Sequence, residues 1–253
     1  MTRPTPNAQL PTSRQDVATA SFWGAGCWKL VVIAFLTCSP ASAAGRAVAF
    51  RSEDGRAIAA AVFEPSQRPA SAVVLVPMLG RPHEDWDAVG QRLADANILA
   101  LAIDLPGSSD PGDSKVLGGW SADVRAAVSY LTSRPEVRVG SIGIAGASLG
   151  ANLAAVAAAD LASVRSLVLV SPSLDYRGIR IEGAMKQYGG RPALLIASSH
   201  DPYAARTVRE LAKDPPGRRE TRFSEAIAHG TALLARDPDV VRTLIEWFQA
   251  TLR

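Results

Sequence analysis

Ser148 is the residue whose surroundings most clearly indicate chemistry in this chain. It lies at the centre of the segment GASLG (146–150), between an apolar run at 142–145 and a stretch of small residues at 151–159 that is typical of a helix. A strand that turns sharply into a helix favours glycine two residues before and after the serine, because a β-carbon would clash there. The pattern predicts a nucleophile elbow with Ser148 as the nucleophile.

A serine nucleophile needs a histidine that accepts its proton and a carboxylate that orients the histidine. After a nucleophile elbow these residues follow in the order serine, acid, histidine. His229 lies on a loop after the predicted strand 220–223, whereas His83 comes too early and His200 directly precedes the best acid. We therefore predict that His229 is the general base.

Asp201 is the best candidate for the acid. It is the first carboxylate after a short buried strand and polar turn within 191–202. Asp201 and His229 would then follow successive strands, within reach of each other at the carboxyl edge of a sheet. Asp175 is the alternative, because it follows the preceding strand at 166–170.

The elements around these residues predict an α/β fold with a mostly parallel central sheet and helices on both faces. Apolar strands at 46–50 and 57–63 flank the turn Asp54-Gly55, which predicts an N-terminal antiparallel hairpin. Strand and helix patterns alternate after the hairpin. The strand 98–104 ends in Asp104, which we interpret as a structural acid that accepts hydrogen bonds from loop amides.

Apolar residues at helical spacing predict the core faces of three helices. These stripes lie at 86–94, 124–131 and 241–248. Asp237 and Pro238 are a suitable cap and first turn for the last of these helices.

From about Ala72 to the C-terminus the chain resembles the α/β-hydrolases, most of all the small dienelactone-hydrolase-like and esterase members. The segment AVVLVPMLG (72–80) is similar to the third strand and oxyanion loop of the family, and DLPGSSD (104–110) is similar to the loop after its fourth strand. The resemblance implies the α/β-hydrolase fold for residues 46–253. It also implies hydrolysis of acyl bonds at the elbow serine.

The predicted oxyanion loop departs from the family pattern. Many members carry His-Gly where this sequence has Pro77-Met78. An oxyanion hole requires only backbone N–H groups, one from Leu149 after the nucleophile and one from Met78 or Leu79 in the early loop. Pro77 has no N–H group and is excluded as a donor.

The connection at 171–192 is where this family usually inserts a lid. It is too short for a large cap domain. The sequence therefore predicts an open pocket and a preference for small or accessible acyl substrates.

Residues 1–45 form a predicted leader. Lys29 precedes the apolar run 30–36, and small residues with the pattern Ala41-x-Ala43 follow, as signal peptidase requires. We expect export to the periplasm or secretion, with no stable membrane association after cleavage. The alternatives are an uncleaved anchor at 22–44 and a lipoprotein modified at Cys38.

Composition narrows the remaining classes of function. Both cysteines, Cys27 and Cys38, lie in the leader, so the mature chain would lack disulfides and thiol nucleophiles. The net charge is +3, and the leader holds three basic and one acidic side chain, which leaves +1 for the mature chain. This balance does not indicate nucleic-acid binding. The scattered histidines do not predict a metal site, and no cofactor is expected.

The sequence thus predicts a serine hydrolase that cleaves an ester, or a related acyl bond, of a small substrate through an acyl-enzyme. Peptidase or acyltransferase chemistry with the same residues is an alternative. A non-catalytic binding protein that retains the fold is another, because fold does not dictate function. The oligomeric state is left open.

Overall fold

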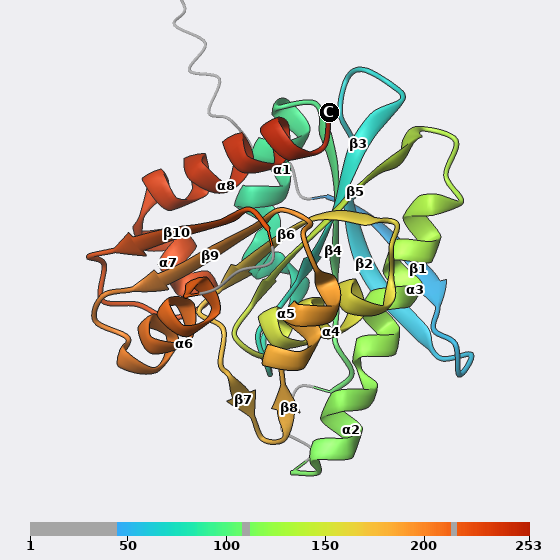
Figure 1. Cartoon of the computed structure of the whole chain (residues 1–253). Helices are drawn as coiled ribbons and strands as arrows, with labels where there is room; N and C mark the ends of the chain where they lie inside the picture. Colours follow the sequence, from blue (N-terminus) through green and yellow to red (C-terminus); the bar gives the residue numbers. More distant parts are fainter. Residues whose placement is uncertain (1–44, 108–111, 214–216) are drawn as a thin grey trace, which may run out of the picture. The chain divides into compact units, whose positions relative to one another are not determined.

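An eight-stranded sheet forms the centre of the computed structural model, which describes residues 45–107, 112–213 and 217–253 (Figure 1). The predicted leader at 1–45 therefore lies outside the described residues, apart from Gly45. In sheet order the strands are β1 (Arg46–Arg51), β2 (Ala57–Phe63), β4 (Ile98–Ile103), β3 (Ala70–Val76), β5 (Val137–Ala147), β6 (Val164–Val170), β9 (Ala193–Ser198) and β10 (Arg219–Ser224).

The N-terminal edge of the sheet is the predicted hairpin. β1 pairs with β2 in antiparallel register, and β2 pairs antiparallel with β4, whereas the remaining strand pairs are parallel. Gly55 adopts φ +85° in the turn, a conformation that glycine tolerates without strain. The Ser52 N–H donates to the Arg56 carbonyl at 2.9 Å and closes the turn.

The sheet separates two hydrophobic clusters, because successive side chains of a strand point to opposite faces. In β3, Val74 and Val76 pack into one cluster, and Val73 and Leu75 pack into the other. All four side chains are buried, as expected for a parallel sheet covered on both faces.

Two groups of helices cover these faces (Figure 1). The face with Val74 and Val76 is covered by α2 (Ser114–Gly119), α3 (Ser121–Thr132), α4 (Leu149–Asp160), α5 (Glu182–Tyr188) and α6 (Pro202–Ala212). The opposite face is covered by η1 (His83–Trp86), α1 (Asp87–Asp95), α7 (Thr231–Arg236) and α8 (Pro238–Thr251). The predicted fold class is confirmed.

The cap predicted for the last helix is present. The Asp237 carboxylate accepts hydrogen bonds from the N–H groups of Asp239 at 3.0 Å and Val240 at 3.2 Å. Pro238 occupies the first turn, where its missing N–H costs nothing. The short helix α7, by contrast, has no counterpart in the sequence prediction.

The connection between β6 and β9 contains only a two-stranded hairpin and a short helix. The hairpin pairs β7 (Asp175–Tyr176) with β8 (Ile179–Arg180), and α5 follows it. The predicted absence of a large lid is confirmed. In the part of the chain that the structure describes, the helices are too short or too polar to span a bilayer.

Candidate active site

The turn from β5 into α4 has the geometry predicted for a nucleophile elbow. Ser148 adopts φ 52° and ψ −119°, a strained conformation for a residue with a β-carbon. A β-carbon on Gly146 would collide with the Gly150 carbonyl, so the turn requires glycine there. Both the strain and the need for glycine follow from how tightly the strand meets the helix.

His229 lies between Ser148 and Asp201 and contacts both. Its Nε2 atom is 2.8 Å from the Ser148 Oγ, and its Nδ1 atom is 2.5 Å from the Asp201 Oδ2. A carboxylate only accepts hydrogen bonds, so Nδ1 carries the proton and Nε2 is left to accept from the serine hydroxyl. The three residues follow β5, β9 and β10, whose carboxyl ends share one edge of the sheet. Their catalytic roles stay a prediction.

The two oxygens of Asp201 have different partners. Oδ1 accepts the Ala204 N–H at 3.1 Å and caps α6, while Oδ2 contacts His229. The side chain is 15% exposed, whereas that of His229 is 49% exposed. The cap fixes the orientation of the carboxylate, which in turn fixes the plane of the imidazole.

Asp175, the alternative acid, has other partners. Its carboxylate accepts from the Gly178 N–H at 2.6 Å and from the Arg180 Nε at 2.9 Å, within the β7–β8 hairpin. The hydrogen bond from Arg180 holds the pKa of Asp175 below its usual value. The structure therefore brings Asp201, and not Asp175, to the histidine.

The predicted oxyanion donors lie on two segments that pack closely. Leu149 opens α4, where a first-turn N–H has no acceptor within the helix. A β-carbon on Gly150 would collide with the carbonyl oxygens of Val76 and Pro77, so the end of β3 lies directly against the start of α4. Met78, the first candidate donor of the early loop, is the next residue along the chain after Pro77.

The rest of the early loop is a tight turn. The Arg81 N–H donates to the Met78 carbonyl at 3.2 Å, and Gly80 adopts φ +67°. Met78 opens this turn and Leu79 follows it, directly after the residues that pack against the start of α4. The arrangement suits the donor set that the sequence predicts.

Comparison with known proteins identifies the family. Residues 73–251 match the model of the Alpha/beta hydrolase family. The chain belongs to the alpha/beta hydrolase family. The resemblance inferred from the elbow and the early loop is confirmed. The curated protein sequences contain no match to this chain.

Solved structures show the same alpha/beta hydrolase fold at low sequence identity. DcsB in complex with its substrate analogue is 14% identical with a TM-score of 0.71, over 82% of this chain and 99% of that one. An esterase of Pyrococcus furiosus is 16% identical with a TM-score of 0.68, over 83% and 92%. Dienelactone hydrolase from Anabaena variabilis is 20% identical with a TM-score of 0.64, over 82% and 97%.

In this alpha/beta hydrolase the Met78 side chain contacts the residues directly after His229. Its Sδ atom accepts the Thr231 N–H at 3.2 Å. This N–H is the first of α7 and has no acceptor within the helix. Gly230 adopts φ +58°, and a β-carbon there would collide with the same sulfur. Sequence reasoning missed this contact, because the two segments are 153 residues apart.

An ion pair extends the contact between the early loop and α7. The Thr231 hydroxyl donates to the Asp85 Oδ2 at 2.9 Å, and Arg81 donates to both Asp85 oxygens at 2.7 Å. The hydrogen bonds from Arg81 lower the pKa of Asp85. On the other side, the Gly230 N–H donates to the Ser171 Oγ at 3.0 Å. The histidine turn is thus held from the early loop and from the end of β6.

The acid at the end of β4 has the role predicted for it. The Asp104 Oδ1 accepts the His83 N–H at 2.8 Å and so ties the loop after β3 to β4. Possible ligand atoms of His83, Glu84 and Asp104 lie within 4.8 Å of one another, a cluster that the sequence spacing did not indicate. In this cluster the His83 Nδ1 lies 3.0 Å from the Asp104 Oδ1.

Proposed function

We propose that this alpha/beta hydrolase is a serine hydrolase that cleaves carboxylic esters, or related acyl bonds, of small substrates. The observation that carries the proposal is the sequence of contacts from the Ser148 Oγ to His229 and from His229 to Asp201, at 2.8 and 2.5 Å. These are hydrogen-bond distances suited to removal of the serine proton.

Acylation would use all three side chains. His229 takes the Ser148 proton as the Oγ attacks the acyl carbon, and Asp201 stabilises the imidazolium that forms. The negative charge moves onto the carbonyl oxygen, where the N–H of Leu149 and that of Met78 or Leu79 stabilise it. The imidazolium then protonates the leaving alcohol, and the carbonyl of the acyl-enzyme re-forms.

Deacylation reverses these proton transfers. His229 removes a proton from water, the hydroxide attacks the acyl-enzyme, and the second tetrahedral intermediate collapses to the acid and free Ser148. The residues named here need no cofactor for either half of the reaction. The short connection between β6 and β9 supports access for small substrates.

Replacement of the nucleophile tests the proposal. We expect Ser148→Ala to lower kcat for p-nitrophenyl acetate by roughly 10⁶-fold, while the thermal unfolding midpoint changes little. A fluorophosphonate probe should label the wild-type protein and not this variant. Wild-type turnover by Ser148→Ala would mean that another residue is the nucleophile. Failure of the wild type to react with the probe would favour the non-catalytic binding protein.

A further inference from the structure

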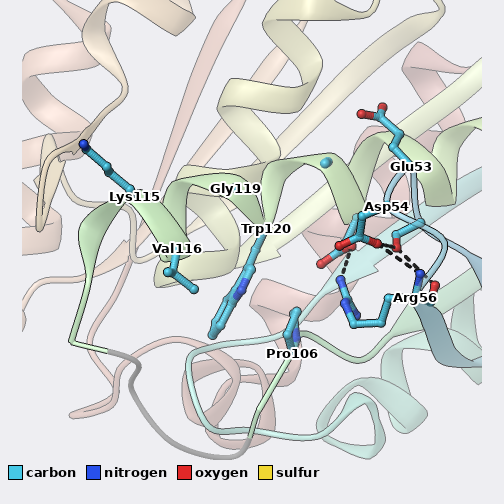
Figure 2. Close-up of a pocket in the computed structure, with 11 residues that line it drawn as sticks. Glu53, Asp54, Arg56, Pro106, Lys115, Val116, Gly119 and Trp120 are labelled. Atoms are coloured by element: carbon cyan, nitrogen blue, oxygen red, sulfur yellow. Dashed lines mark hydrogen bonds and ion pairs between the residues drawn. The ribbon is translucent and has the colours of Figure 1, made fainter.

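A cavity of about 350 Å³ lies beside the β1–β2 turn (Figure 2). It is lined by the turn, by Pro106 after β4, by α2 and by the start of α3. Ser148, Asp201 and His229 do not line it. A volume of this order accommodates a small organic molecule.

Asp123 lines the cavity and is 2% exposed. Its Oδ1 accepts from the Arg56 Nη2 at 2.5 Å, while its Oδ2 is buried and has no hydrogen-bond partner in the described part of the chain. Burial raises the pKa of this carboxyl group, against the opposing effect of Arg56. A buried carboxylate oxygen without a donor is costly, so a donor supplied by a ligand would be strongly favoured there.

The charges nearest Asp123 favour a cation. Asp54 and Asp123 are both acidic, and the Arg56 guanidinium is already paired with Asp123. Asp54 accepts from the Ser52 hydroxyl and from the Arg56 N–H, and the hydrogen bond from Ser52 holds its pKa below the usual value. Figure 2 shows Lys115 directed away from Arg56. Glu53 also lines the cavity and pairs with Arg125 at 3.4 Å. Three carboxylates therefore line the cavity with two cationic side chains, those of Arg56 and Lys115.

Part of the cavity wall is apolar. Figure 2 shows Trp120, Val116 and Pro106 converging beside Arg56. Trp120 is 7% exposed and Val116 is 46% exposed. An indole ring packs well against an organic group and also attracts cations.

We propose that this cavity binds a small organic ammonium ion, which donates an N–H to the Asp123 Oδ2 and packs its organic group against Trp120. The ammonium supplies the missing donor and balances the second carboxylate. An anion would have to compete with Asp123 for Arg56, and a neutral alcohol would leave the charge unbalanced. The site does not depend on the proposed hydrolase activity, because the two share no residue.

Calorimetric titration of the full-length protein with benzylammonium, benzyl alcohol and benzoate tests the proposal. We expect benzylammonium to bind at least roughly tenfold more tightly than the alcohol, which retains the ring and one donor but lacks the charge. Benzoate should not bind. This comparison uses the unaltered protein, so it holds whether or not a variant folds.

The Asp123→Asn variant tests whether binding depends on this carboxylate. We expect it to weaken benzylammonium binding about tenfold or more, while Glu246→Gln, the same loss of charge on the exposed face of α8, leaves it unchanged. The circular dichroism spectrum and the thermal unfolding midpoint of each variant report that it is folded. Absence of benzylammonium binding up to about 10 mM, equal binding of the alcohol, tighter binding of benzoate, or an unaffected folded Asp123→Asn variant would each overturn the proposal.

Discussion

Single residues in this protein serve two partners at once. Asp201 caps α6 with one oxygen and contacts His229 with the other. An asparagine could still cap the helix through its carbonyl oxygen, because both residues are good N-caps. It could not hold the imidazole in the same tautomer, since its amide N–H₂ is a donor. The two roles of the carboxylate are therefore separable by experiment.

We expect Asp201→Asn to lower kcat for p-nitrophenyl acetate by roughly 10⁴-fold with little change in the free energy of unfolding. Asp175→Asn is the matched control. It removes a charge from an exposed ion pair with Arg180, and such a pair contributes little to stability. Steady-state kinetics and urea unfolding measure both effects. A larger loss of kcat in Asp175→Asn would reassign the acid.

Close approaches between elements position the site. Gly150 lets the start of α4 lie against the end of β3, and Gly230 lets the histidine turn lie against the Met78 sulfur. The first contact places the two oxyanion donor segments together. The second contact links the early loop to the turn after His229. Both the proposed oxyanion donors and the proposed general base therefore depend on Met78.

Gly230→Ala tests the second contact. We expect it to lower the free energy of unfolding by about 2 kcal/mol and to lower kcat, because the residue has φ +58° and its β-carbon meets the Met78 sulfur. Met78→Ala removes that sulfur. The Met78→Ala/Gly230→Ala double variant should therefore lose less stability than the sum of the two single variants.

A second glycine provides the control. A β-carbon on Gly183 in α5 would meet open space, so Gly183→Ala should leave stability unchanged or raise it by about 0.5–1 kcal/mol. Urea unfolding measures the free energy of unfolding of all four variants. Additive losses in the double variant would show that the Met78 side chain does not contact position 230.

At the scale of the whole molecule, the sheet order decides which loops meet. β5 lies between β3 and β6, and β9 and β10 complete the same parallel edge. The early loop, the elbow and the two later loops therefore converge at the carboxyl ends of the strands. The β6–β9 connection adds only a small hairpin and α5 there.

We expect this arrangement to favour short acyl chains. In a series of p-nitrophenyl esters, kcat/KM should be highest for acetate to butyrate and should fall for longer chains, because the described structure has no lid to cover a long chain. Higher kcat/KM for long-chain esters or triglycerides than for short-chain esters would contradict the small-substrate proposal.

The leader proposed at 1–45 concerns the fate of the whole protein. We expect the full-length protein, expressed in a bacterium, to be exported and cleaved after Ala43. Ala41 and Ala43 are the small residues that signal peptidase requires before its cleavage site. N-terminal sequencing of the protein from the periplasmic fraction checks this. Full-length protein retained in the membrane fraction would instead favour the uncleaved anchor.

The sequence by itself determined the features that depend on neighbouring residues. The elbow glycines, the Asp54-Gly55 turn, the Asp237 cap and the alternation of strands and helices are local patterns, and each is present in the structure. The order of serine, acid and histidine also named the three residues that meet, although it left Asp175 as an alternative acid.

Only the tertiary structure decided what depends on strand order and packing. It separated Asp201 from Asp175 by giving each a different partner. It placed Met78 against Thr231, 153 residues away, and Arg56 against Asp123, 67 residues away. Contacts of this kind leave no periodic or spacing signal, because they arise where separate segments pack and not from the conformation of any one of them.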